Sequence, residues 1–261
     1  MKSTLRLVLA GHFLFLMACK KNSSKKREET GNPTEQPVKR FVPLKLESDE
    51  LQIAFKYQEN TANLIEILAS DGHTMTITYK NKQPYEIRKM KNNKPFQLVD
   101  YVKDKEGLPK ARSFDESGPV FTPTGYYILD YDQNQQLGKI RFYKDNGELF
   151  RESALTYSLG NVTAQIQSNY PGGVKNLQYT YDLKNGIFKH INCLERLVLE
   201  IRYPFFSASQ NNILSSSGTE TPLENITYSY EYNADNYPSK LMITAHNRKQ
   251  TFKITYAELK Q

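Results

Sequence analysis

Tyr-Tyr-Ile-Leu-Asp-Tyr-Asp-Gln-Asn-Gln-Gln-Leu-Gly-Lys-Ile-Arg-Phe-Tyr, the stretch from residue 126 to residue 143, contains the pattern that decides the fold. Leu129 and Tyr131 flank a polar residue, a polar segment follows, and an apolar residue returns at Ile140. Period-two alternation with Tyr and Ile at the apolar positions is typical of β-strands, and the polar segment indicates a turn. The stretch therefore predicts a β-hairpin.

The same unit, an apolar residue, a mostly polar residue and a tyrosine, recurs along the chain. Its eight copies end at Tyr57, Tyr79, Tyr101, Tyr131, Tyr157, Tyr181, Tyr232 and Tyr256. In seven copies an apolar residue returns eight to ten positions later, at Ile67, Ile87, Ala111, Ile140, Ile166, Ile191 and Leu241. Most copies are separated by the length of one hairpin with its connection, so the repeat predicts an array of hairpins.

The fold class follows from the two faces of these strands. The apolar residue and the tyrosine of each unit share one face, and the residue between them lies on the other. A meander of about 14 strands with one apolar face must curl or fold over to bury that face. We therefore expect an all-β, mainly antiparallel fold, a large curved meander of tandem hairpins that forms either a half-barrel or a sandwich.

One segment departs from the strand pattern. Its apolar residues have helical spacing, at Ile187, Ile191, Leu194, Val198 and Ile201. Asn192 with Glu195 resembles a capping box, and Pro204 would end the run. This pattern predicts one short helix near 193–202.

The N-terminus has the features of an export signal. Lys2 and Arg6 precede an apolar run at 7–16, which is shorter than the roughly 20 residues of a bilayer-spanning helix. The run ends Leu16-Met-Ala-Cys19, which resembles a bacterial lipobox. That resemblance implies a signal peptide at 1–18 and lipidation of Cys19. The alternative is a cysteine that happens to end an ordinary signal peptide.

Composition divides the remaining chain. Residues 20–45 are polar and contain almost no apolar residue before Phe41, so we expect a lipidated cysteine and flexible tether at 19–45 and a hairpin domain at 46–261. The chain carries 35 Lys and Arg against 28 Asp and Glu. The excess lies in the leader and tether, and residues 46–261 are balanced. A folded nucleic-acid-binding surface is therefore not expected.

Several segments resemble a known family. They are Cys19-Lys-Lys, Tyr131-Asp132, Tyr181-Asp182, Gln210-Asn211-Asn212-Ile213-Leu214, and Tyr228-Ser-Tyr-Glu-Tyr-Asn-Ala-Asp-Asn-Tyr-Pro238. With these, the chain is similar to lipoproteins of Bacteroidota that carry a Tyr-rich tandem β-hairpin domain of unknown function. It also has a distant likeness to Tyr-Asp repeats of the RHS type. The resemblance implies an envelope location and an all-β fold, and it implies no chemistry.

The sequence contains no motif of a known catalytic or cofactor site. His73, His190 and His246 are isolated from one another, so no metal site is expected, and we expect no cofactor. Cys193 is interpreted as an inert thiol rather than a nucleophile. The regularly spaced tyrosines favour sheet packing, with a stacking platform for sugar or peptide as the alternative.

Two long insertions are the candidate binding regions, because long loops on a rigid sheet are where binding usually resides. They are Ser113–Gly125 and Phe205–Asn225. The candidate binding residues in them are Phe114, Phe121, Phe205, Phe206, Asn211 and Asn212. The alternative is that Phe205 and Phe206 close the open end of the curled sheet.

Two functions remain open at this stage. The first is a non-enzymatic envelope lipoprotein that binds or scaffolds a glycan or another envelope protein, anchored to the membrane at Cys19. The second is an envelope hydrolase that acts on glycan through loop carboxylates such as Asp115, Glu116, Glu220 and Glu224. Lys20 replaces the aspartate that retains lipoproteins at the inner membrane of enteric bacteria, which favours the outer membrane and leaves the exposed face open.

Overall fold

The fold is described here from a computed structural model, which covers residues 39–259 with the exception of 202, 204, 219–224 and 247. The signal peptide, Cys19 and most of the tether, which were predicted from sequence, lie outside the described residues. The described part contains one short helix, α1 (Leu194–Leu197), and sixteen strands. The strands are β1 (Phe41–Glu47), β2 (Gln52–Tyr57), β3 (Leu64–Ala69), β4 (His73–Lys80), β5 (Gln83–Lys91), β6 (Lys94–Lys103), β7 (Pro109–Asp115), β8 (Thr122–Tyr131), β9 (Leu137–Tyr143), β10 (Leu149–Ser158), β11 (Asn161–Asn169), β12 (Val174–Tyr181), β13 (Ile213–Gly218), β14 (Ile226–Tyr232), β15 (Pro238–Ala245) and β16 (Arg248–Glu258).

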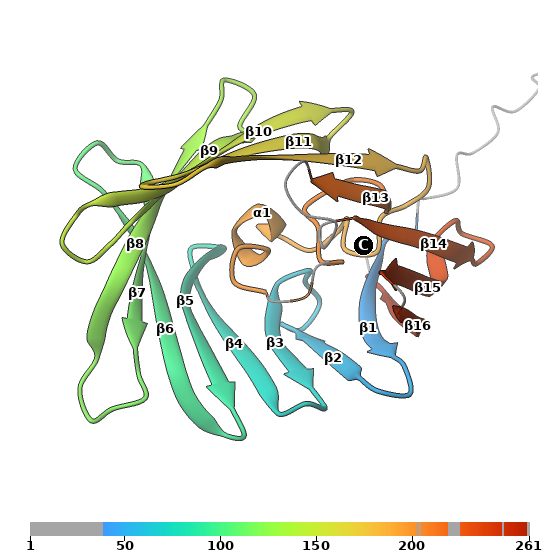
Figure 1. Cartoon of the computed structure of the whole chain (residues 1–261). Helices are drawn as coiled ribbons and strands as arrows, with labels where there is room; N and C mark the ends of the chain where they lie inside the picture. The colour runs from blue at the N-terminus through green and yellow to red at the C-terminus, as the bar shows by residue number, and fades with distance from the viewer. Residues whose placement is uncertain (1–38, 202, 204, 219–224, 247, 260–261) are drawn as a thin grey trace, which may run out of the picture. The chain divides into compact units, whose positions relative to one another are not determined.

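The strands form a closed antiparallel barrel (Figure 1). Each strand pairs with its neighbours in sequence, and β1 pairs with β16 from Phe41↔Glu258 to Glu47↔Lys253. The all-β meander is confirmed, whereas the predicted half-barrel or sandwich is wrong. The physical reason is β1, which includes residues 41–45 that the composition placed in the tether. This strand pairs the free edges of β2 and β16 and so removes both.

Six of the eight repeated tyrosines mark a β-bulge at the end of an even-numbered strand. The pairing register shifts immediately before Tyr57, Tyr79, Tyr131, Tyr157, Tyr181 and Tyr232. Several of these tyrosine hydroxyls donate a hydrogen bond to a backbone carbonyl in the preceding strand. Examples are Tyr57 to Pro43 O at 2.9 Å and Tyr157 to Leu137 O at 3.0 Å. Because alternate strands run in the same direction, these tyrosines gather at one end of the barrel, here called the tyrosine rim.

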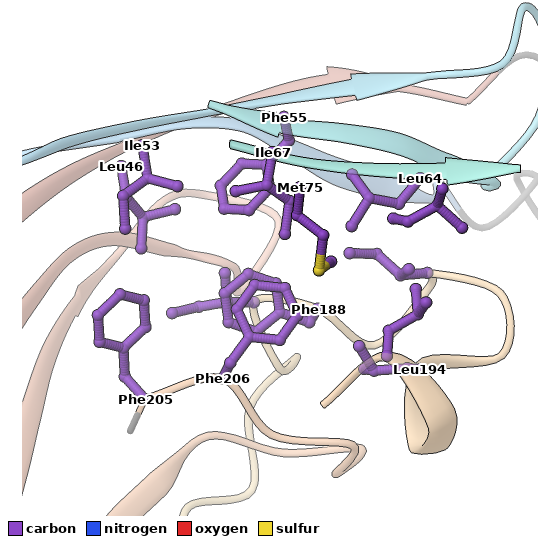
Figure 2. Packing of buried hydrophobic residues seen from close by; sticks show 14 of the residues in the cluster. Leu46, Ile53, Phe55, Leu64, Ile67, Met75, Phe188, Leu194, Phe205 and Phe206 are labelled. Atoms are coloured by element: carbon purple, nitrogen blue, oxygen red, sulfur yellow. The ribbon is translucent and has the colours of Figure 1, made fainter. Parts of the chain in front are cut away.

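The segment between β12 and β13 enters the barrel (Figure 1) and is called the plug, residues 182–212. Its buried apolar residues, among them Phe188, Leu194 and Phe206, pack against inward residues of β1–β4 (Figure 2). Phe188 and Phe206 stack with ring centroids 3.8 Å apart. The helical spacing of the apolar residues at 187–201 therefore reflects side chains that are buried on several sides of the plug.

The helix itself is shorter than the predicted 193–202, and the capping box does not form. Cys193 is the N-cap residue, with a left-handed φ of 54°, and no side chain caps the helix. Asn192 instead donates from its backbone to Ala62 O at 3.1 Å and from its side chain to Asn63 Oδ1 at 2.8 Å. Asn192 therefore ties the plug to the β2–β3 connection.

The outward face of the barrel carries cross-strand ion pairs. Lys56 contacts Glu66, Arg112 contacts Asp100, and Lys240 Nζ lies 2.7 Å from Glu231 Oε1, each pair joining residues directly opposite each other. Further along, Arg141 pairs with Asp130, and Lys139 pairs with Glu152. Charge on the outside and apolar side chains inside is the alternation that the repeat predicts.

Candidate luminal site

The barrel interior has two unlike sides. Inward residues of β1–β5, β15 and β16, here called the packed wall, include Leu46, Ile53, Leu64, Ile87 and Phe252, each with no exposed surface. Most inward residues of β10–β12, here called the open wall, are half-buried, such as Leu155, Gln165, Gln167 and Leu177. The plug packs on the packed wall and leaves space beside it.

Two neighbouring cavities open beside the plug, away from the tyrosine rim. One, of about 200 Å³, lies among β3–β6 and the end of the plug; it is lined mainly by apolar and aromatic side chains that include Ile67, Met75, Phe96 and Tyr203. The other, of about 240 Å³, extends along β6–β10 and is lined by Gln97, Ser113, Thr124, Tyr127, Phe142, Phe150 and others. Both contact Lys89, Gln97 and Glu200, which form the boundary between them.

A buried ion pair lies at that boundary. Glu200, in the plug, is the only buried charged residue in the described part of the chain, with 8% of its surface exposed. Lys89 Nζ lies 2.6 Å from Glu200 Oε2, and the Tyr127 hydroxyl donates to Glu200 Oε1. Burial raises the pKa of Tyr127 and also that of Tyr101, whose hydroxyl lies 3.0 Å from that of Tyr127, so both remain protonated. Sequence reasoning missed Glu200, although its position as the one acid within the otherwise apolar stretch 197–201 could have indicated it.

Neutral polar side chains line the space opposite the plug. Gln97 Nε2 donates to Ser113 Oγ at 2.7 Å, and Thr124 donates to the same oxygen at 3.0 Å. On the open wall, Gln165 Nε2 donates to Ser153 Oγ at 3.1 Å. Amides and hydroxyls held in this way offer both donors and acceptors to a polar ligand.

Arg151 lies on the inward face of β10, opposite Phe142 of β9. Its guanidinium carbon is 3.8 Å from the Phe142 ring centroid and 5.8 Å from that of Phe150. Its Nε is buried and has no hydrogen-bond partner. Burial lowers the pKa of this guanidinium. No pattern in the sequence distinguished Arg151 from the other arginines.

The predicted binding residues come together only in part: Phe205, Asn211 and Asn212 line one small space of about 10 Å³, and the other residues lie elsewhere. Phe114 lies on β7 beside Arg112, and Phe121 is exposed in the β7–β8 connection; most of the first insertion belongs to these two strands. Phe205 and Phe206 are buried in the plug. Asn211 and Asn212 form hydrogen bonds at the C-terminal end of the plug. That these residues bind a partner stays a prediction.

The asparagine contacts are specific. Asn211 Nδ2 donates to Lys184 O at 2.7 Å and its Oδ1 accepts from Asn161 at 2.9 Å. Asn212 is 4% exposed, donates to Asp182 Oδ2 at 3.1 Å and accepts from the Ile187 amide at 3.1 Å. Both side chains fasten the plug between β12 and β13.

Of the loop carboxylates, Asp115 and Glu116 do not line either cavity. Asp115 is exposed at the end of β7, where hydrogen bonds from the side chain and backbone of Ser117 lower its pKa, and Glu116 Oε2 pairs with Arg88 Nε at 3.0 Å. Glu220 and Glu224 lie outside the described residues.

Burial raises the pKa of the Cys193 thiol. Within the described ranges, no group of three His, Cys, Asp or Glu is arranged to hold a metal ion.

Comparison with known proteins shows the fold alone. A crystal structure of a porin-like protein from Bacteroides uniformis matches with a TM-score of 0.53 and 14% identity, over 84% of this chain and 96% of that one. A second porin-like protein, from Bacteroides vulgatus, matches with a TM-score of 0.44 and 12% identity, over 83% of this chain and 98% of that one. No family model and no curated protein sequence matches the chain.

Proposed function

We propose that this chain is a non-enzymatic cell-envelope lipoprotein whose barrel binds a ligand in its interior. The observation that carries the proposal is the incompletely filled lumen. The plug does not fill the interior, and the remaining space is lined by fixed amides, hydroxyls and aromatic rings. Ligand sites are typically concave, largely apolar and provided with a few oriented polar groups.

The surface of the barrel argues against a pore in lipid. A barrel that spans a membrane needs an outward apolar band and commonly has a polar lumen. In this chain the outward positions of β2–β3, β6–β7 and β14–β15 carry ion pairs, and the largest apolar cluster is inside. None of the described helices has the length and hydropathy to cross a bilayer. The charged outward face supports the proposal that the barrel lies in water, attached through the predicted lipid at Cys19.

The anchor is tested by labelling with a palmitate analogue in cells. The wild-type chain and a Cys193→Ser control take up label, whereas Cys19→Ser takes up none and keeps its signal peptide. Equal labelling of all three chains contradicts the lipoprotein assignment. Fractionation of the labelled chain then tests the outer-membrane location, which rests on Lys20.

Ligand binding is tested with residues 39–261, because this part forms a compact unit that contains every strand of the barrel. A screen of mono- and oligosaccharides and of envelope-derived small molecules, followed by thermal shift, should find a ligand that raises the melting temperature. Phe142→Trp would provide a fluorescent reporter beside the cavity, since the chain has no tryptophan. Channel conductance in planar bilayers, without any luminal ligand, would contradict the proposal.

A further inference from the structure

The two cavities beside the plug adjoin each other. Lys89, Gln97 and Glu200 line both of them. The plug contributes Ile201 to one cavity and Leu199 to the other, with Glu200 between these two residues in the chain. A ligand with two parts therefore has room to place one part in each cavity.

The smaller cavity, here called the apolar cavity, suits an apolar group. Its lining includes Ile67, Met75, Phe96 and Ile201, and the first two of these side chains are buried. Its volume is about 200 Å³. Because an apolar protein cavity of about 150 Å³ can bind benzene, a ring of phenyl size fits this space.

The larger cavity, here called the polar cavity, has a different lining. Gln97 Nε2 donates to Ser113 Oγ at 2.7 Å, Thr124 donates to the same oxygen at 3.0 Å, and all three residues line the cavity. Phe142 and Phe150 line it as well. Amides and hydroxyls beside aromatic rings suit a sugar, whose hydroxyls need donors and acceptors and whose C–H faces pack on rings.

The ion pair between the cavities offers hydrogen bonds without a net charge. Lys89 Nζ lies 2.6 Å from Glu200 Oε2, and the Tyr127 hydroxyl donates to Glu200 Oε1. Each oxygen of a carboxylate accepts about two hydrogen bonds, so among the described contacts each Glu200 oxygen retains an acceptor position. Because its two partners already hold the carboxylate in place, it is oriented for a ligand hydroxyl at the boundary.

From these observations we infer that the luminal ligand is a glycoside with an apolar aglycone. The aglycone occupies the apolar cavity, the sugar ring occupies the polar cavity, and the bond that joins them lies beside Gln97 and Glu200. The inference rests on the proposed luminal binding and names the ligand class for it.

The test uses residues 39–261 and isothermal titration with two matched probes, phenyl β-glucopyranoside and methyl β-glucopyranoside. They share the sugar and differ only in the aglycone. The wild type is expected to bind the phenyl glucoside about 10- to 100-fold more tightly, the value of burying one phenyl ring.

Variants of the lining test each half of the ligand separately. Ile201→Trp fills the apolar cavity and should abolish the preference for the phenyl glucoside. Ile166→Trp, at an exposed position of β11, is the matched control and should keep the full preference. Ser113→Ala removes the hydroxyl that accepts from Gln97 and Thr124, so it should weaken both glucosides by the same factor, about 2- to 10-fold.

A second change in the apolar cavity guards against a structural effect of the new indole ring. Phe96 is 37% exposed, so Phe96→Ala leaves the core intact and should lower the preference for the phenyl glucoside several-fold. The melting temperature of Ile201→Trp should lie within about 5 °C of the wild-type value. If Ile201→Trp does not fold, Phe96→Ala decides, and an unchanged preference in that variant overturns the inference.

The outcomes distinguish this inference from the function beneath it. Equal binding of the two glucosides by the wild type overturns the role of the apolar cavity while supporting luminal binding. Unchanged affinity of both glucosides in Ser113→Ala places the sugar elsewhere and also overturns the inference. Binding of neither probe overturns the glycoside ligand, and the wider ligand screen then decides the proposed function.

Discussion

The packed wall and the open wall of the barrel are built from the same repeating unit, yet only one of them carries a core. On β2–β4 the inward positions are Ile53, Phe55, Ile67, Met75 and Ile77, all buried against the plug. On β10–β12 the equivalent positions include Arg151, Ser153, Gln165 and Gln167, and most remain partly accessible. Hairpin geometry is thus common to both walls, and the chemistry of the inward residues decides which wall the plug covers.

This difference separates stability from binding. A plug that filled the lumen would bury more apolar surface and leave no ligand space. A lumen without a plug would expose the apolar residues of β1–β5 to water. One wall packed and the other open satisfies both needs, and each wall can be altered while the other is monitored.

The largest expected effect comes from truncating one aromatic ring on each side. Phe206→Ala should lower the free energy of unfolding by about 4 kcal/mol, because the buried ring packs on Phe188 and Phe55. Phe150→Ala, beside the open wall, should cost about 1 kcal/mol, because its ring is half-buried at a cavity. Urea denaturation of both variants measures the contrast. Equal losses would show that the two walls contribute equally to the core.

The buried ion pair should have the next largest effect. Glu200→Ala leaves Lys89 without its partner and should cost about 3 kcal/mol. The double variant Lys89→Met with Glu200→Met should recover most of this loss, because no buried charge remains. Glu231→Ala, whose partner Lys240 is on the outward face, should cost less than about 0.5 kcal/mol. An equal cost inside and outside would contradict the burial of Glu200.

The tyrosine rim should instead show that the two walls are alike at their ends. Tyr57→Phe and Tyr157→Phe each remove one hydroxyl-to-carbonyl hydrogen bond, at 2.9 Å on the packed side and 3.0 Å on the open side. Each should cost about 1 kcal/mol. Tyr85→Phe is the control, since this tyrosine is exposed and lies outside the repeat. A large loss of stability at only one of the two rim positions would contradict the expectation that the two walls are alike at their ends.

Much of this architecture could be predicted from local pattern, and the parts that could not depend on distant residues. The tyrosine unit located the even-numbered strands because alternation and turns are local properties. Closure of the barrel depends on β1, a short strand next to a polar segment, whose pairing with β16 spans the whole domain. The 182–212 segment was recognised as a departure, but its entry into the barrel depends on an interior large enough to hold it. Glu200 and Arg151 carry no motif, and only the fold gives them their surroundings.

The smallest effect concerns the docking of the plug at the tyrosine rim. His190 Nε2 lies 2.7 Å from the Tyr237 hydroxyl, and burial, with Arg40 and Lys189 nearby, lowers the pKa of His190 from 6.5 to about 4. Because the folded pKa is below the unfolded one, the unfolded chain binds more protons between these values, and stability falls as pH decreases from 6.5 toward 4. The side chain is only partly buried, so the expected loss is about 1 kcal/mol or less. His190→Gln keeps a polar partner for Tyr237 and removes the titration, so its unfolding free energy should change less between pH 7.5 and pH 4.5 than that of the wild type. If wild type and variant lose the same stability over this range, His190 does not couple the plug to the rim through its proton.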